Sequence, residues 1–195
     1  LRDADARLSA EKGRAEALQA RLTQAEAAKR SEAAPPARPS TPRRDAMARS
    51  AIDVHFSPGD ECLFAICRQI DSAESTADVC VFTITDDRIA ARLLDAHRRG
   101  VRVRIITDND KAHDDGSDVH RLARAGIEVR VDQSPFHMHH KFAIFDERRM
   151  LTGSYNWTRG AARDNEENLL VSDDPRLLRA FGREFASLWE KLAKR

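Results

Sequence analysis

From Ile52 onward, short apolar runs alternate with amphipathic stretches, and few folds are compatible with this pattern. The apolar runs, such as residues 78–84 and 101–107, are rich in Val and Ile and are typical of β-strands. The stretches between them carry apolar residues at helical spacing, and glycine follows two of them, at Gly100 and Gly126. This alternation predicts an α/β fold in which a mixed β-sheet is flanked by helices.

The same pattern predicts the individual elements. Strands are expected at residues 52–56, 78–84, 101–107, 127–131, 139–145, 149–153 and 169–172. Helices are expected at residues 62–73, 87–99, 118–125 and 174–192. Ser57 is expected to cap the first helix, with Pro58 in its first turn. The strand at residues 78–84 is apolar almost throughout, so we expect it at the centre of the sheet.

The first fifty residues differ in composition from the rest. Residues 1–33 are rich in Ala, Glu, Arg and Leu and show a weak heptad repeat. We expect a helix there, which either forms a short coiled coil with a partner or remains single. Residues 34–50 are rich in proline and arginine and are expected to be a basic linker. This linker is either a spacer or a tail that touches phosphates.

Charge and cysteine content exclude some classes of protein. Residues 1–49 carry 11 Lys/Arg and 7 Asp/Glu, whereas the remainder carries 22 and 25, so any attraction of phosphate to the folded region must come from local clusters. Cys62, Cys67 and Cys80 form no Cys-x-x-Cys pair, which argues against a disulfide framework or a zinc site. No apolar run reaches the roughly 18 residues of a membrane span. We expect a cytoplasmic protein whose chain continues upstream of Leu1.

One apolar run carries an unusual set of polar side chains. Residues 139–146 read His-His-Lys-Phe-Ala-Ile-Phe-Asp, and residues 153–157 read Gly-Ser-Tyr-Asn-Trp. In a β-strand, His139 and Lys141 would face the same side, while the apolar residues beyond them face the core. A nucleophile or acid beside a fixed cation is what attack on a phosphodiester requires.

This pattern resembles the phospholipase D superfamily, in which His-x-Lys-x-x-x-x-Asp is followed by Gly-Ser-x-Asn and by an acidic position, here within residues 165–168. Five segments are similar to the single-motif branch of the superfamily: residues 101–104, 107–108, 125–127, 138–144 and 152–158. That branch holds a bacterial phospholipase D-like nuclease and the mitochondrial phospholipase D, or Zucchini-type, endonucleases. The resemblance implies a phospholipase D-like fold, with residues 51–195 as the catalytic domain.

The resemblance also implies a role for each of five side chains. His139 would attack phosphorus and form a covalent phosphohistidine, and Lys141 would hold a non-bridging oxygen. Ser154 and Asn156 would hydrogen-bond the same phosphate. Glu167, rather than its neighbour in sequence, would orient a catalytic imidazole.

Further residues are expected to support this site. Gly153 would permit a tight turn, and Asp146 would have a structural role away from the phosphate. Arg159 and Arg163 would follow a phosphate backbone. A metal site built on His137 and its neighbours is not favoured, because histidine and lysine supply both the nucleophile and the electrostatic stabilisation. No metal or cofactor is therefore expected.

Three hypotheses for the function remain open: a metal-independent endonuclease on single-stranded nucleic acid, a phospholipase D-type hydrolase of a lipid such as cardiolipin, and a non-catalytic phosphate-binding module. The loop at residues 108–118 is polar and mostly acidic, unlike the rim of a lipid-facing protein, which favours the nuclease over contact with a membrane. Because one motif is half of a double-displacement site, we expect a homodimer with both His139 side chains at its twofold axis.

Overall fold

The computed structural model describes residues 50–193 of the chain. The helix or coiled coil expected at residues 1–33, and all but the last residue of the linker expected at 34–50, lie outside this range. The boundaries proposed for these segments therefore stay predictions. No helix in residues 50–193 has both the length and the apolar character needed to cross a membrane.

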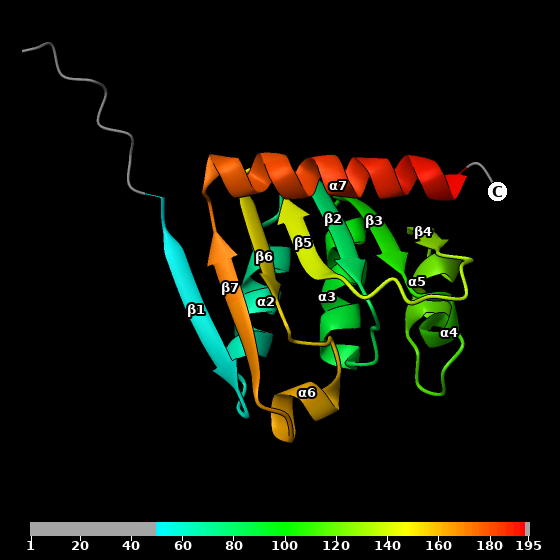
Figure 1. Ribbon diagram of the computed structural model, residues 1–195, viewed down its shortest axis with the longest axis horizontal. Helices are drawn as coiled ribbons and strands as arrows, with labels where there is room; N and C mark the ends of the chain where they lie inside the picture. Colours follow the sequence, from blue (N-terminus) through cyan, green and yellow to red (C-terminus); the bar gives the residue numbers. More distant parts are fainter. Residues whose placement is uncertain (1–49, 194–195) are drawn as a thin grey trace, which may run out of the picture. The chain divides into compact units, whose positions relative to one another are not determined.

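A seven-stranded mixed sheet organises the described residues, with the strand order β1-β7-β6-β5-β2-β3-β4 (Figure 1). The strands are β1 (Ile52–Ser57), β2 (Thr76–Val81), β3 (Arg102–Thr107), β4 (Glu128–Val131), β5 (Lys141–Phe145), β6 (Arg149–Gly153) and β7 (Glu167–Ser172). The helices are α2 (Glu61–Ser72), α3 (Asp87–Arg98), α4 (Asn109–Ala112), α5 (Val119–Arg124), α6 (Arg159–Arg163) and α7 (Pro175–Ala193). The predicted mixed α/β fold is confirmed.

The sheet has a parallel part and an antiparallel part. β2, β3 and β4 pair in parallel, whereas β5, β6, β7 and β1 continue from β2 as antiparallel neighbours. As its apolar sequence predicted, β2 is an inner strand, flanked by β3 and β5, and its residues Val79, Cys80 and Val81 are fully buried.

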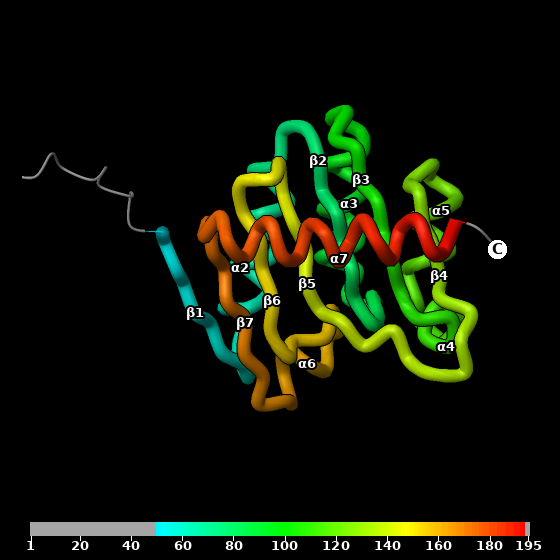
Figure 2. The backbone as a smooth tube through the Cα atoms, turned by 45° about the horizontal axis from the view of Figure 1, so that its top comes forward, coloured from blue at the N-terminus to red at the C-terminus, as the bar shows by residue number. Residues whose placement is uncertain are grey.

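Helices cover both faces of this sheet. α2 and α3 contribute Ile66 and Leu93 to one core, which includes Val79 of β2. On the other face α7 runs across the strands (Figure 2). It buries Phe185 and Trp189 in a second core. Successive strand residues therefore alternate between two apolar layers, which leaves the ends of the strands for polar chemistry.

Local sequence signals explain where most helices begin and end. Asp86 caps α3 by accepting a hydrogen bond from the Arg88 N–H. Gly100 and Gly126 follow the ends of α3 and α5 with φ of +93° and +95°, a left-handed conformation that favours glycine. The helices expected at 87–99 and 118–125 are thus found with shifts of one residue.

The expected start of the first described helix is wrong. α2 begins at Glu61, and Ser57 is the last residue of β1 instead of its cap. The Ser57 hydroxyl donates to the carbonyl oxygen of Asn165 at 2.8 Å and accepts the Glu167 N–H at 3.2 Å. The Ser57 hydroxyl is hydrogen-bonded to the segment that leads into β7, so it does not cap α2, which starts four residues later.

Candidate active site

The five side chains of the expected site come from segments that meet at one end of the sheet. His139 and Lys141 lie where β5 begins, Ser154 and Asn156 follow β6, and Glu167 opens β7. β2 and β3 also end here, because Val81 of β2 pairs with Lys141 of β5 (Figure 1). In open α/β sheets, the carboxyl ends of parallel strands are where ligands bind.

His139 and Lys141 meet in a way that strand alternation did not predict. β5 begins at Lys141, so His139 belongs to the segment that enters the strand. The Lys141 ammonium turns back and donates to the carbonyl oxygen of His139 at 2.9 Å. Both side chains also contact Phe82, whose ring centroid lies 4.5 Å from that of His139 and 5.0 Å from Lys141 Nζ. Phe82, just after β2, is a site residue that sequence analysis missed.

Desolvation shifts the titration of both groups. Partial burial lowers the pKa of His139, and the positive charges of Lys141 and His137 lower it further, whereas Asp108 opposes them. Burial also lowers the pKa of Lys141, and the Glu167 carboxylate acts in the other direction. A lowered histidine pKa keeps more of the imidazole neutral near pH 7, which is the form that acts as a nucleophile.

Lys141 has unused donor capacity. Its side chain is almost buried, and the hydrogen bond to His139 is the one it makes within residues 50–193. No carboxylate in that range forms an ion pair with it. An ammonium has three N–H donors, and a buried cation without a counter-ion is unfavourable. An anionic ligand would therefore be stabilised beside His139.

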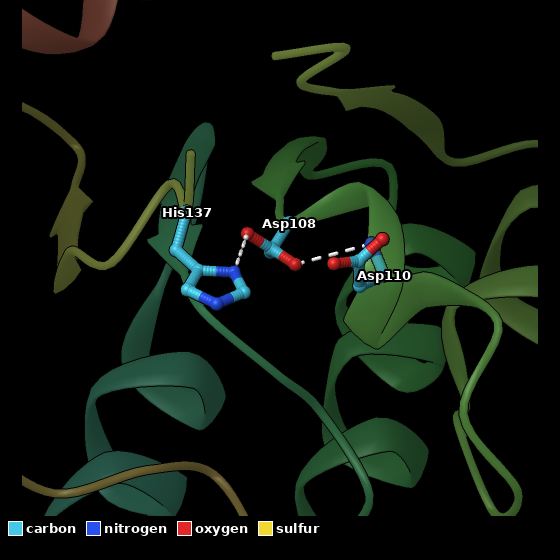
Figure 3. A group of neighbouring side chains, drawn as sticks. All are labelled: Asp108, Asp110 and His137. Carbon is cyan, nitrogen blue, oxygen red and sulfur yellow. Dashed lines mark hydrogen bonds and ion pairs between the residues drawn. The ribbon is translucent and has the colours of Figure 1, made fainter. Parts of the chain in front are cut away.

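Asp108, just after β3, fixes the segment that leads into β5 (Figure 3). It is fully buried, and its Oδ2 accepts the Met138 N–H at 3.0 Å and lies 3.1 Å from Nδ1 of His137. Its Oδ1 accepts the N–H groups of Asp110 and Lys111 at the start of α4. The chain before His139 is thereby tied to the end of a strand 30 residues away in sequence.

The same region contains a group of side chains with metal-ligating atoms. Within residues 50–193, such atoms of Asp108, Asp110 and His137 all lie within 4.8 Å of one another (Figure 3). Each Asp108 oxygen already has two hydrogen-bonding partners, so coordination of a cation would break contacts that hold the Met138 segment. We therefore describe this group as a hydrogen-bonded clamp, and the absence of a metal requirement stays a prediction.

Gly153 lies against the backbone of β7 at the end of β6, and not in the tight turn that was expected. It is the last residue of β6, and a Cβ atom there would overlap the carbonyl oxygen of Asn168. Ser154 follows, and its Oγ accepts the backbone and side-chain N–H groups of Asn168 at 3.1 and 3.3 Å. Glycine is required because the β7 backbone occupies the space of a side chain.

Asn156 and Glu167 differ in whether their side-chain oxygens have hydrogen-bond partners. Oδ1 of Asn156 is buried and has no hydrogen-bond partner in the described part of the chain. Glu167 Oε1 accepts from the Asn165 amide at 3.2 Å. No hydrogen bond within residues 50–193 joins Glu167 to His139 of the same chain, and the expected pairing of Glu167 with a catalytic imidazole stays a prediction. Burial lowers the pKa of Lys141, and the negative charge of Glu167 partly offsets this shift.

The two arginines that were expected to follow a phosphate backbone lie on α6, at the same end of the sheet (Figure 1). Arg159 forms an ion pair with Asp87 at 2.7 Å, between two exposed side chains. Arg163 is exposed and has no ion-pair partner among residues 50–193. Arg163 is thus the more available cation of the two.

Asp146 lies at the opposite end of β5 from Lys141. Its carboxylate accepts the N–H groups of Glu74, Ser75 and Thr76 and the Ser75 hydroxyl, all at 2.7–2.9 Å. Although burial acts in the other direction, these hydrogen bonds lower the pKa of Asp146 to about 2. The side chain holds the segment before β2 and does not take part in the candidate site.

We expect Asp146→Asn to lower the free energy of unfolding by about 1–2 kcal/mol at pH 7. Asn tolerates the left-handed backbone at this position, where φ is +53°, so the change isolates the carboxylate. The folded pKa of about 2 lies below the unfolded value near 3.9, so the stabilisation is present above about pH 4 and is lost as the pH falls through 2. Urea unfolding should show the difference between variant and wild type shrinking to roughly half at pH 3. A difference independent of pH would contradict this explanation.

Comparison with known proteins places the chain in a family. Residues 66–189 match the family described as "Cardiolipin synthase, PLD-like domain". The chain is 53% identical over 121 residues to a mitochondrial cardiolipin hydrolase of Chlamydomonas reinhardtii, which covers 62% of this chain and 54% of that protein. It is 41% identical over 133 residues to the Homo sapiens protein of the same name, covering 68% and 53%. The chain thus spans little more than half the length of these curated relatives.

Comparison with solved structures gives the same fold. The phospholipase D family member Nuc from Salmonella typhimurium has a TM-score of 0.68 at 30% identity, covering 72% of this chain and 95% of that chain. NucT from Helicobacter pylori shares the fold with a TM-score of 0.67 at 23% identity, covering 72% and 96%. The predicted cytoplasmic location is contradicted, because relatives from an alga, a frog and human are named mitochondrial proteins. The predicted superfamily is confirmed: the chain belongs to the phospholipase D-like family.

Proposed function

We propose that this protein is a metal-independent phosphodiesterase in which His139 forms a covalent phosphohistidine. Membership of the family, whose relatives are named hydrolases and phospholipase D, supports phosphodiester hydrolysis as the reaction class. The observation that carries the assignment of the site is the nearly buried ammonium of Lys141, beside His139 and without a carboxylate partner in the described range. Such a cation favours an anion at the point where the imidazole can reach it.

In the proposed reaction the neutral His139 imidazole attacks phosphorus. A P–N bond forms while the P–O bond to the leaving group breaks, and Lys141 stabilises the charge on a non-bridging oxygen. Asn156 would donate to the phosphate from its Nδ2 amide group. Its buried Oδ1, which has no hydrogen-bond partner in residues 50–193, can only accept. Water then attacks phosphorus and gives a proton to the second imidazole described below, and the P–N bond breaks to return His139 in its neutral form.

The leaving oxygen needs a proton, and the chain carries one copy of the motif. We propose that a twofold homodimer brings a second His139 to the opposite side of the phosphorus, where its imidazolium donates that proton. The site would then be composite, with one nucleophile and one acid from two copies. Residues 1–33 are proposed as a second contact between the copies.

Two substrate classes are candidates. The rim formed by α4 and the following loop carries acidic and polar residues, and Arg163 is exposed on α6 at the same end of the sheet, which favours single-stranded nucleic acid over a lipid surface. Cardiolipin-type lipid is the second candidate, because relatives are named cardiolipin hydrolases and Phe136, near His137, is 78% exposed. Those names also favour a mitochondrial location.

We expect wild-type protein to hydrolyse a phosphodiester in the presence of excess EDTA. Purified protein would be incubated with labelled single-stranded DNA, single-stranded RNA, duplex DNA and cardiolipin vesicles, with and without the chelator. Faster cleavage of single strands than of vesicles supports the nuclease, and the reverse order supports the lipid hydrolase. Strict dependence on added divalent cation would overturn the histidine mechanism. It would favour a metal site at Asp108, Asp110 and His137 instead.

A further inference from the structure

Lys111 is a cation at the site that the sequence motifs do not include. It lies on α4, at the end of the sheet where β2 and β3 finish (Figure 1). Its Nζ is 5.7 Å from the centroid of Phe82. The same ring contacts the imidazole of His139 and the ammonium of Lys141. Three basic side chains, one from α4 and two from the start of β5, therefore lie around one aromatic ring.

The backbone of Lys111 is held by a hydrogen bond to a buried carboxylate, whereas its ammonium forms only a solvent-accessible ion pair. Its N–H donates to the buried carboxylate of Asp108 at 3.2 Å, so the side chain starts from a defined point. Its ammonium pairs with Asp114 at 2.6 Å, with 32% and 46% of the two side chains exposed. An exposed pair of this kind contributes little to stability and is readily exchanged. An anion that approaches Phe82 can therefore replace Asp114 as the partner of Lys111.

We propose that Lys111 binds a second phosphate of the substrate, next to the phosphate that His139 attacks. This inference rests on the proposed function, and it names the chemistry of the substrate as a molecule with two phosphodiesters. Neighbouring nucleotides provide such a pair, and so do the two phosphates of cardiolipin. A lysine ammonium binds phosphate as a point charge, so Lys111 contributes to capture of the substrate and not to formation of the P–N bond.

The test compares substrates that differ by one phosphate. Thymidine 5′-(p-nitrophenyl phosphate) is compared with the corresponding ester of a dinucleotide, and phosphatidylglycerol with cardiolipin, each pair in the same vesicles or buffer. Lys111→Gln should lower kcat/KM for the two-phosphate substrate at least fivefold more than for its one-phosphate partner. The effect should appear as a higher KM, with kcat little changed. Asp114→Asn should act in the opposite direction, because it releases Lys111.

Arg98→Gln is the matched control. Arg98 also forms an exposed i,i+3 ion pair, with Asp95, but it lies at the end of α3 remote from the ends of β2 and β3. This variant should leave the ratio between one-phosphate and two-phosphate substrates unchanged. The nucleotide and lipid arms separate the two sources of the second phosphate.

Binding without turnover separates this inference from the proposed function. Titration calorimetry of each substrate pair with the His139→Ala protein, with and without Lys111→Gln, gives the same comparison when no hydrolysis occurs. Weaker binding of the two-phosphate ligand alone supports the inference even if wild-type protein is inactive. Equal weakening of both ligands, or of neither, overturns it, whatever the activity of the wild type.

Discussion

Replacing His139 by alanine is expected to lower kcat by about 10⁴-fold or more on any phosphodiester that the wild-type protein cleaves. The substitution removes the proposed nucleophile and, in a twofold dimer, the proposed acid as well. The fold should be unaffected, because His139 is largely exposed, with only part of its ring desolvated, and its side chain makes no hydrogen bond within residues 50–193. Steady-state kinetics and circular dichroism on the same preparation check both statements.

His140→Ala is the matched control for this experiment. The adjacent imidazole lies 3.6 Å from Glu184 on α7 and packs against Phe142, so it belongs to the other side of the segment. Its loss should change kcat by no more than a few-fold. The acid limb of the wild-type pH–rate profile should lie below the ordinary histidine pKa, because the surroundings of His139 lower its pKa and the nucleophile must be neutral. A His139→Ala protein that retains a tenth of the activity would contradict the mechanism.

Lys141→Met is expected to change activity and stability in opposite directions. kcat/KM should fall by about 10²–10³-fold, because the cation that stabilises charge on the phosphate is lost. The free energy of unfolding should rise by about 1 kcal/mol, because methionine fills a similar volume without burying an ammonium that forms no ion pair within residues 50–193. Enzyme assays and urea unfolding measure the two effects.

A Lys141→Arg protein provides the comparison for that variant. It keeps a positive charge but replaces the compact ammonium by a larger guanidinium, so we expect partial activity and no gain in stability. If Lys141→Met instead lowered the free energy of unfolding, the buried ammonium would be a structural contact and not a group awaiting an anion.

The sheet and its helices were accessible from sequence because their signals are local. Gly100 and Gly126 end helices through their own backbone conformation, and the apolar runs place strands within a few residues of the observed bounds. Ser57 was wrongly predicted to cap a helix, because its hydroxyl binds a segment more than a hundred residues away in sequence. Helices as short as α4 and α6 lack the periodicity that would identify them.

The candidate site could be predicted from sequence only in part, because its contacts join segments that are far apart in the chain. The residue types of the motif identified His139 and Lys141, but their meeting depends on Phe82, which is brought near by the pairing of β2 with β5. The contact of Gly153 with Asn168 likewise depends on the pairing of β6 with β7. Such long-range contacts have no periodic signature in a single sequence.

The buried carboxylate of Asp108 has a consequence for the energetics of binding. The segment that carries His139 is outside any strand, yet its Met138 N–H is held at 3.0 Å by a fully buried acceptor. The entropy lost in ordering this segment is therefore lost once, when the chain folds, and is not subtracted from the affinity each time a substrate arrives. The His139 imidazole is therefore positioned before the substrate binds, and less entropy is lost in reaching a near-attack geometry.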